Sequence, residues 1–110
     1  YSGGGIVFLD ARNDQAYTAG HIPGSYQLDY YYKEKYLPTV LPVLMSAVTI
    51  VVYCNGGECE DSELTASLLL QAGIPPSRIF VYAGGFSEWE STGLPVELQA
   101  RHSGITKGKP

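Results

Sequence analysis

The chain has 110 residues, of which 45% are hydrophobic and 16% charged, a length and composition expected of one globular domain with one core. The 7 Lys and Arg against 11 Asp and Glu give a net charge of −4, and an acidic chain without a basic stripe is not expected to bind nucleic acid. No apolar run approaches the length of a membrane span or forms a signal peptide, so we expect no direct membrane contact from this segment.

The first quarter of the chain predicts two strands separated by a helix. Residues 6–9 form a short apolar run that ends at Asp10, which is typical of a buried parallel strand. Asn13 can cap a short helix that ends at Gly20. A turn-rich connection then leads to a short predicted strand at residues 26–28.

A run of tyrosines precedes the next predicted helix. Tyr30, Tyr31 and Tyr32 are adjacent and cannot all face a core, so at least one of them should be exposed. Residues 37–47 carry apolar side chains at helical spacing and predict a helix, although Pro42 falls inside it.

The second half of the chain again alternates strands and helices. We expect a strand at residues 48–53, a helix at 61–72, a strand at 78–82 and a short helix at 86–91. Asp61 is the expected N-cap of the longer helix, and Gly73 is its expected stop. Such alternation implies an α/β domain with a parallel sheet whose two faces are both covered by helices.

A tight loop between the strand at residues 48–53 and the following helix begins with Cys54. Gly56 and Gly57 allow the backbone to close tightly, and inward N–H groups together with the helix dipole would form an anion site. The same field favours the thiolate form of a cysteine, which is the nucleophilic form. The alternative is that Cys54 is a small buried hydrophobic residue at a strand end.

The position of Cys54 in the predicted sheet favours a functional role. Asp10, Cys54 and Tyr82 all fall at or near the carboxyl ends of predicted strands. Ligands of open parallel sheets bind outside these ends, so three polar or reactive groups are expected to converge there.

Three separated stretches of the chain form a set of motifs in a characteristic order. They are Asp10-Ala11-Arg12 with Tyr17 and Gly20-His21-Ile22-Pro23-Gly24-Ser25, then Val51-Val52-Tyr53-Cys54, and finally Gly84-Gly85-Phe86-Ser87-Glu88-Trp89 with Gly93-Leu94-Pro95-Val96. Over roughly residues 6 to 97, the chain resembles the rhodanese-like domain of the sulfurtransferase family.

The resemblance implies a three-layer α/β fold with a central five-stranded parallel sheet and helices on both faces. We expect a single such domain over residues 1–100, and the lack of a core pattern predicts a polar tail at residues 101–110. The resemblance also implies that Cys54 accepts a sulfane sulfur as a persulfide and passes it to a thiophilic acceptor without a cofactor. The active-site loop would then consist of Asn55, Gly56, Gly57, Glu58, Cys59, Glu60, Asp61 and Ser62.

Physical chemistry assigns supporting roles to the other residues of these motifs. Asp10 and Arg12 are expected to form a charged, hydrogen-bonded contact that fixes the strand end near the loop. His21 is expected to be a structural histidine and not a ligand. Trp89 is expected in the core, with its indole N–H bonded to a backbone carbonyl.

The loop differs from the family pattern in its charge. It carries Glu58, Glu60 and Asp61, and it has no Lys or Arg. Each acid about 4 Å from a thiolate would oppose it by about 1 kcal/mol in water. Thiosulfate, a dianion, is therefore expected to be a poor donor.

A second cysteine is the other departure. Cys59 lies five residues after Cys54, so the two sulfurs could form a disulfide or pass a persulfide between them. Cys59 as a surface thiol without a role remains an equal alternative. Two thiols without a matched His or Cys pair do not complete a tetrahedral shell, so no metal site is expected.

These features leave two hypotheses for function open. The first is a sulfurtransferase that uses Cys54, with a sulfur donor and a thiol or protein sulfur acceptor as its partners. The second is a catalytically silent module that recognises a protein or senses oxidants through Cys54 and Cys59. A cysteine phosphatase is rejected, because it needs an arginine to close the loop and Glu60 occupies that place.

The sequence does not identify the donor, the acceptor, the oligomeric state or the compartment. Because it starts at Tyr1 and not at Met, we expect it to belong to a larger chain. A cytoplasmic location is favoured, and a periplasmic one stays open for a segment of a larger protein.

Overall fold

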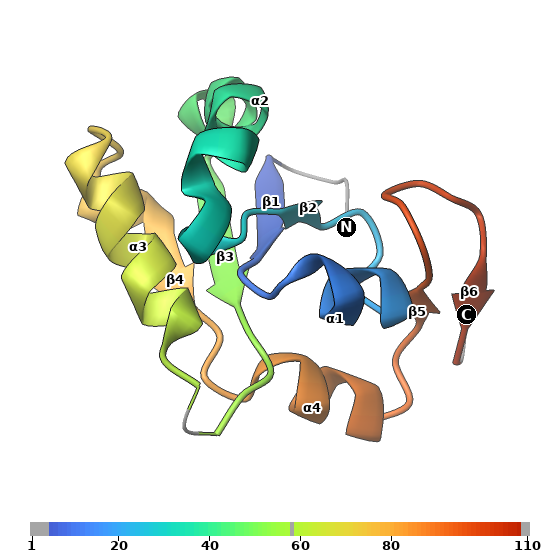
Figure 1. Ribbon diagram of the computed structural model, residues 1–110. Helices are drawn as coiled ribbons and strands as arrows, with labels where there is room; N and C mark the ends of the chain where they lie inside the picture. Colours follow the sequence, from blue (N-terminus) through green and yellow to red (C-terminus); the bar gives the residue numbers. More distant parts are fainter. Residues whose placement is uncertain (1–4, 58, 109–110) are drawn as a thin grey trace.

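The computed structural model describes residues 5–57 and 59–108. Its elements are β1 (Ile6–Asp10), α1 (Asp14–Ala19), β2 (Tyr26–Gln27), the 3₁₀ turn η1 (Tyr30–Tyr32), α2 (Lys33–Ser46), β3 (Thr49–Tyr53), α3 (Asp61–Gln71), the 3₁₀ turn η2 (Pro76–Arg78), β4 (Ile79–Val81), α4 (Gly85–Ser91), β5 (Val96–Glu97) and β6 (Thr106–Lys107) (Figure 1). Strands and helices alternate as the sequence predicts.

The main sheet is parallel, with the strand order β2-β1-β3-β4. Its register pairs Asp10 with Gln27 on one side and with Tyr53 on the other. The last residue of β1 therefore lies beside the last residue of β3. The carboxyl ends of these strands meet at one edge of the sheet, as expected.

The expectation of five parallel strands is wrong by one strand. In the described residues the parallel sheet has four strands, and β5 pairs antiparallel with β6 instead. The backbone of His21 also binds Glu97 of β5 in both directions, at 2.9 Å. These contacts hold β5 beside the turn after α1 and away from the edge of the main sheet.

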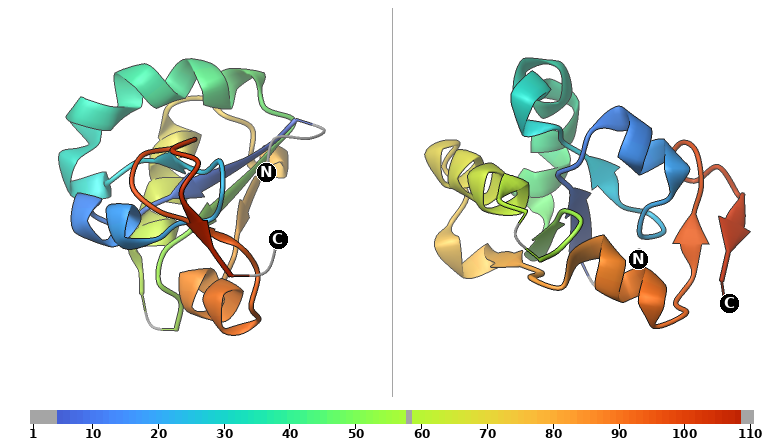
Figure 2. Two further views of the ribbon diagram at one scale, coloured as in Figure 1. Left: turned by 90° about the vertical axis from the view of Figure 1, so that its right-hand side faces the viewer. Right: turned by 60° about the horizontal axis from the view of Figure 1, so that its bottom comes forward.

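Helices cover both faces of the sheet, which confirms the three-layer arrangement. On one face, α2 and α3 pack against Leu9, Ile50 and Val52, which are completely buried. On the other face, Phe86 of α4 packs with Tyr53. Figure 2 (right) shows α2 and α3 on one side of the strands and α4 on the other.

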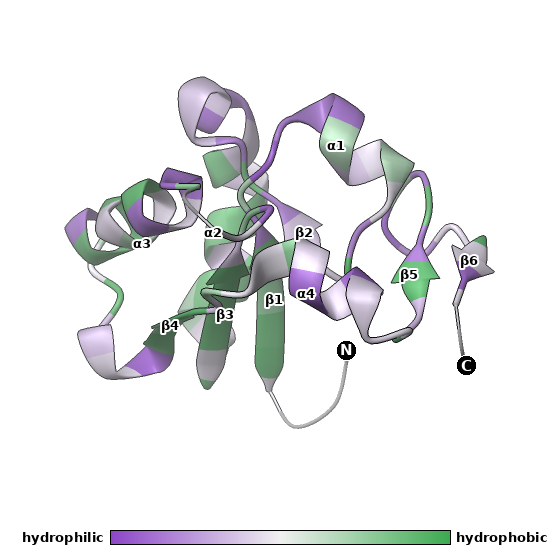
Figure 3. Ribbon diagram, turned by 90° about the horizontal axis from the view of Figure 1, so that it is seen from below, coloured by the Kyte–Doolittle hydropathy of each residue, from purple (hydrophilic) through white to green (hydrophobic). Residues whose placement is uncertain are grey.

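The composition of the strands explains why both faces need cover. Figure 3 shows that β1, β3 and β4 are mainly hydrophobic along their lengths. Successive side chains of a strand point to opposite faces, so continuous apolar runs present apolar side chains to both layers. None of the helices in the described ranges is long and apolar enough to cross a membrane.

The start of α2 differs from the sequence prediction. The helix begins at Lys33, four residues before the predicted start, and contains both Pro38 and Pro42. The Asp29 side chain accepts a hydrogen bond of 3.0 Å from the N–H of Tyr31 and caps the η1 turn, which leads directly into α2. Tyr31 and Tyr32 are each 65% exposed, so the prediction that part of the tyrosine run faces solvent is confirmed.

The predicted N-cap is confirmed for α1 but is wrong for α3. Asn13 caps α1, because its side-chain oxygen accepts a hydrogen bond of 2.8 Å from the N–H of Ala16. For α3, the expected cap at Asp61 is wrong by one residue. The N-cap is Glu60, whose side chain makes no capping hydrogen bond, and Asp61 is the first helical residue.

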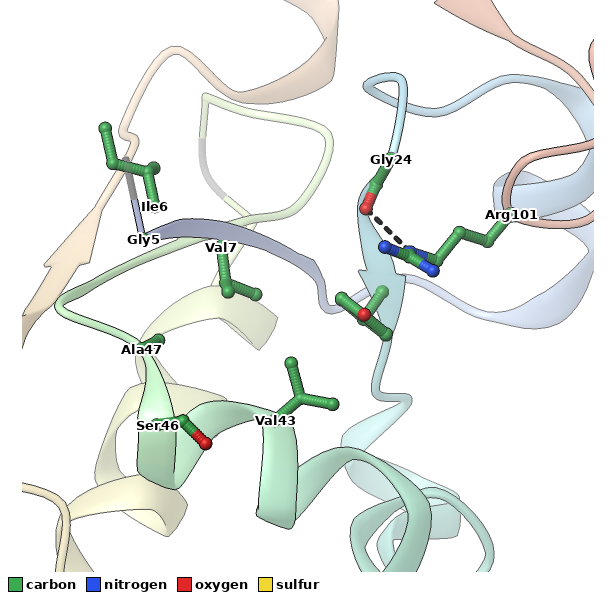
Figure 4. Close-up of a pocket in the computed structure, with 9 residues that line it drawn as sticks. Gly5, Ile6, Val7, Gly24, Val43, Ser46, Ala47 and Arg101 are labelled. Atoms are coloured by element: carbon green, nitrogen blue, oxygen red, sulfur yellow. Dashed lines mark hydrogen bonds between the residues drawn. The ribbon is translucent and has the colours of Figure 1, made fainter. Parts of the chain in front are cut away.

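The polar segment after residue 100 packs back onto the domain as far as it is described. The guanidinium of Arg101 lies 3.8 Å from the ring centroid of Tyr26, and its Nε donates to the carbonyl of Gly24 at 3.0 Å. Figure 4 shows this hydrogen bond at the side of a cavity of about 410 Å³ between β1, β2 and α2. The cavity includes Gly5 and Ile6, so it lies at the amino end of β1, away from the Cys54 loop.

Candidate active site

The candidate site lies where β1, β3 and β4 end. The N–H of Ala11 donates to the carbonyl of Tyr53 at 2.8 Å, and the N–H of Tyr82 donates to the carbonyl of Val52 at 2.9 Å. These bonds extend the strand pairing to the last residue before Cys54. Cys54 therefore starts its loop at the carboxyl edge of the sheet, where Asp10 and Tyr82 also lie, as the sequence predicts.

Cys54 is buried, with 2% of its surface exposed, and its sulfur has two neighbours. It forms a disulfide with Cys59, and the two Cα atoms are 6.5 Å apart. The hydroxyl oxygen of Ser62 lies 3.6 Å from the Cys54 sulfur. Because a disulfide sulfur carries no proton, the hydroxyl is the donor of this pair. The first turn of α3 thus supplies a polar contact to Cys54.

The first turn of α4 holds the other side of the loop. The N–H of Phe86 donates to the carbonyl of Cys54 at 2.8 Å, and the N–H of Ser87 donates to the carbonyl of Asn55 at 2.9 Å. Figure 1 shows the loop after β3 and the start of α4 at the same edge of the sheet. The sequence predicts a short helix at residues 86–91 within this motif, but it gives no indication of the contact with the loop.

This contact needs glycine on both sides. Gly85 has a φ of +61°, and a Cβ atom there would lie 2.5 Å from the backbone nitrogen of Gly56. Gly56 has a φ of +109°, and a Cβ atom there would overlap the carbonyl of Gly84. Only residues without a Cβ atom allow the two backbones to approach this closely.

We expect Gly85→Ala to lower the free energy of unfolding by at least about 2 kcal/mol, since it adds a backbone collision to the strain of a positive φ. Gly93→Ala is the matched control, because Gly93 has a φ of +81° but no atom within 4 Å of a Cβ at that position. It should cost only about 1 kcal/mol. Urea unfolding of both variants measures the difference, and equal losses would show that the loop contact is unimportant.

Arg12 and Asp10 form the predicted contact, and it reaches the loop. The guanidinium Nη2 lies 2.7 Å from the Asp10 carboxylate and donates to the carbonyl of Gly20 at 2.5 Å. Its Nη1 donates to the side-chain oxygen of Asn55 at 3.3 Å. The guanidinium carbon also lies 4.3 Å from the ring centroid of Phe86. Arg12 therefore links the end of β1, the loop and α4.

The charge of Arg12 is secured by its partner. Burial acts to lower the pKa of Arg12, but the hydrogen bond and the charge of Asp10 oppose this, and the pKa is raised. Asp10 is completely buried and Arg12 is 5% exposed. The pair is thus an ion pair inside the domain, and it adds no net charge beside Cys54.

His21 is structural, as the sequence indicated. It is completely buried, with Nδ1 3.1 Å from the carbonyl of Ile22 and Nε2 3.0 Å from the carbonyl of Gln99. The ring stacks on Tyr17 at a centroid distance of 3.9 Å. Both ring nitrogens therefore face groups of the domain itself, and neither faces the Cys54 loop.

Two further aromatic residues of the motifs have clear structural contacts. The N–H of Ile22 donates to the hydroxyl of Tyr53 at 3.0 Å, and burial raises the pKa of Tyr53 well above its usual value. The indole N–H of Trp89 donates to the carbonyl of Pro95 at 2.8 Å, which confirms the predicted backbone bond. These residues hold the scaffold under the loop.

The acidic residues of the loop differ in their surroundings. Glu60 is exposed, and Glu58 lies outside the described residues. The carboxylate of Asp61 accepts a hydrogen bond of 3.2 Å from the hydroxyl of Tyr31, whose pKa it raises. Sequence reasoning missed this role of Tyr31, because a contact across 30 positions has no local signal.

No group of three or more His, Cys, Asp or Glu side chains in the described ranges is arranged to hold a metal ion. The reactive groups that the fold brings together are Cys54, Cys59 and the Ser62 hydroxyl. Within residues 5–57 and 59–108, the backbone N–H groups of Asn55, Gly56 and Gly57 donate no hydrogen bond to another backbone group. This arrangement suits sulfur chemistry at Cys54.

These features define a three-layer α/β domain with a cysteine-bearing loop at the carboxyl edge of its parallel sheet. The model of the rhodanese-like domain family matches residues 1–92, and the chain belongs to that family.

The chain is similar to proteins with different names. The thiosulfate sulfurtransferase GlpE of Pseudomonas entomophila is 34% identical over 88 residues, covering 80% of this chain and 73% of that protein. The HTH-type transcriptional regulator Rv0324 of Mycobacterium tuberculosis is 31% identical over 94 residues, and the match spans 86% of this chain but only 38% of that protein. The crystal structure of the BH2092 protein from Bacillus halodurans matches with a TM-score of 0.71 and 25% identity, over 86% of this chain and 64% of that one.

Proposed function

We propose that the domain is a sulfurtransferase that carries a sulfane sulfur as a persulfide on Cys54 and passes it to a thiophilic acceptor. The observation that carries this proposal is the environment of Cys54, which is buried at the carboxyl edge of the sheet with the Ser62 hydroxyl 3.6 Å away. Relatives named thiosulfate sulfurtransferase at 34% and 32% identity support it. Because of these relatives, the alternative of a silent recognition or redox-sensing module is less favoured.

The reaction would take place in two steps on reduced Cys54. The thiolate attacks the sulfane sulfur of a donor, forms a new S–S bond and expels the rest of the donor with the electron pair of the broken bond. A nucleophilic acceptor then attacks the outer sulfur and releases the Cys54 thiolate. The anionic sulfur of both the thiolate and the persulfide would be stabilised by hydrogen bonds. The donors would be the Ser62 hydroxyl and the N–H groups of Asn55, Gly56 and Gly57.

Intact-mass spectrometry tests this proposal. The Cys59→Ser variant, which cannot form the internal disulfide, is reduced and freed of reductant. It is then treated with an aromatic thiosulfonate as donor. We expect a gain of one sulfur atom, about 32 Da, located on the peptide that contains Cys54. An accessible Cys54 thiol that gains no sulfur would overturn the proposal.

The exposed charge of Glu60 predicts a weak reaction with thiosulfate that Glu60→Arg improves by about threefold to tenfold. The substitution removes one negative charge and adds one positive charge. Each of these changes alters the electrostatic energy of the Cys54 thiolate by up to about 1 kcal/mol in water. Thiosulfate:cyanide transfer should be measured in a Cys59→Ser background at low and at high salt, because salt screens exposed charges over about 8 Å.

Glu90→Arg is the matched control for this prediction. It makes the same change of charge near the end of α4, where Glu90 is exposed and lies 3.6 Å from Lys107. Its effect on the rate should be much smaller. A strong initial reaction that Glu60→Arg does not improve would contradict the electrostatic argument.

A further inference from the structure

The disulfide between Cys54 and Cys59 lies at the atom that the proposed function uses. A persulfide and this disulfide cannot coexist, because both need the Cys54 sulfur. Cys59 is also held in place: its N–H donates to the carbonyl of Gly56 at 3.3 Å, so the loop turns back on itself. The loop therefore places a second thiol within bonding reach of the first sulfur of a persulfide on Cys54.

We propose that Cys59 is a second catalytic residue, a resolving thiol that discharges the Cys54 persulfide as hydrosulfide. This inference rests on the proposed function of Cys54. It adds an activity to that function, the reduction of sulfane sulfur by a dithiol. It also assigns a role to the cysteine for which the sequence left a surface thiol as an equal alternative.

The chemical step is balanced within the loop. The Cys59 sulfur attacks the inner sulfur of the persulfide, which is the Cys54 Sγ, and the bond between the two sulfurs of the persulfide breaks. The outer sulfur leaves as hydrosulfide with the bonding electron pair and with the proton of the Cys59 thiol. Two thiol sulfurs are oxidised to a disulfide, and one sulfane sulfur is reduced to sulfide. The product is the Cys54–Cys59 bond that the structure contains.

The surroundings of the two cysteines indicate how the disulfide is reopened. Cys54 is 2% exposed, whereas Cys59 is half-buried, so an incoming thiolate can reach the Cys59 sulfur more readily. Attack there releases Cys54 as the leaving thiolate, beside the Ser62 hydroxyl. A dithiol reductant then closes its own disulfide and frees Cys59. The partner implied is therefore a dithiol, either a small molecule or a protein.

The charge of the loop also favours an internal thiol over an anionic acceptor. Glu60 and Asp61 follow Cys59 directly, and negative charges slow the entry of anions such as sulfite or cyanide. The Cys59 thiol is already present in the loop, and it needs no encounter with an anion. The same charges assist the departure of hydrosulfide.

A single-turnover experiment tests the inference. Reduced protein, freed of reductant, receives one equivalent of an aromatic thiosulfonate, whose leaving group is a sulfinate and not a sulfide. We expect the wild-type chain to release about one equivalent of hydrosulfide, to lose two hydrogens in mass and to yield a Cys54–Cys59 cross-linked peptide. Cys59→Ser should hold the sulfur on Cys54 and release less than about a tenth as much until dithiothreitol is added.

Three other results would contradict the inference, and each can be told apart from the others. A wild-type chain that retains its persulfide as Cys59→Ser does would overturn the resolving role and leave the proposed function intact. Hydrosulfide released by Cys54→Ser would show that Cys59 acts without the persulfide on Cys54, which also overturns it. If no variant takes up sulfur from the donor, the proposed function fails, and the inference fails with it.

Discussion

Cys54→Ser is expected to lower sulfur transfer from an aromatic thiosulfonate to cyanide by at least about a thousandfold. A serine hydroxyl is a weak nucleophile at neutral pH unless a base activates it. His21 does not supply this base, because it is completely buried and both of its ring nitrogens are directed at groups of the domain and away from the Cys54 loop. The variant therefore keeps the shape of the site but lacks a nucleophile that can attack the donor sulfur.

The variant also loses the disulfide, so its stability needs a matched comparison. A bond that closes so short a loop is worth about 2 kcal/mol. Cys59→Ser loses the same disulfide but keeps Cys54, and it should still gain sulfur on that residue. Thermal unfolding under reducing conditions should give similar midpoints for both variants and the wild type. Full transfer by Cys54→Ser, or a failure of Cys59→Ser to form the persulfide, would contradict the assignment of Cys54.

Arg12→Met is expected to lower the free energy of unfolding by about 3–5 kcal/mol. The substitution leaves the completely buried Asp10 carboxylate without its counter-charge. It also removes the donors that bind the carbonyl of Gly20 and the side chain of Asn55. Both the end of β1 and the active-site loop lose a support.

Two comparison variants make this result specific, with urea unfolding as the measurement. Arg78→Met changes an exposed arginine and should alter the stability by no more than about 0.5 kcal/mol. The double variant Asp10→Asn, Arg12→Met removes both charges and should recover part of the loss, because no isolated charge stays buried. If Arg12→Met remained within about 1 kcal/mol of the wild type, the ion pair would not be a main support of the site.

The features that were predicted correctly are those encoded over a few neighbouring residues. The apolar run before Asp10 specifies a buried strand, and Asn13 caps the helix whose third residue it binds. Cys54 directly follows the buried strand β3, so its place at the carboxyl edge follows from the parallel topology. The contact of Asp10 with Arg12 spans only two positions, so the order of neighbouring residues was enough to predict it.

The features that were missed depend on residues far apart in the sequence. The fifth parallel strand that the resemblance implies is not found in the described residues; β5 pairs with residues 106–107 instead, and the backbone of His21 holds it beside α1. Likewise, the hydrogen bond from Tyr31 to Asp61 joins segments that only packing brings together. The same is true of the backbone hydrogen bonds between α4 and the loop. No periodicity or spacing reports such contacts.

The sequence by itself determined the alternation of strands and helices, the covered parallel sheet, and the place of Cys54 at its carboxyl edge, because hydrophobic periodicity and strand direction follow from local residue order. Only the tertiary structure decided which of the alternatives for Cys59 applies. Four intervening residues allow the chain either to fold back or to point outward. The turn at Gly56 and the fixing of Cys54 by α4 select the folded-back form, in which the two sulfurs are bonded.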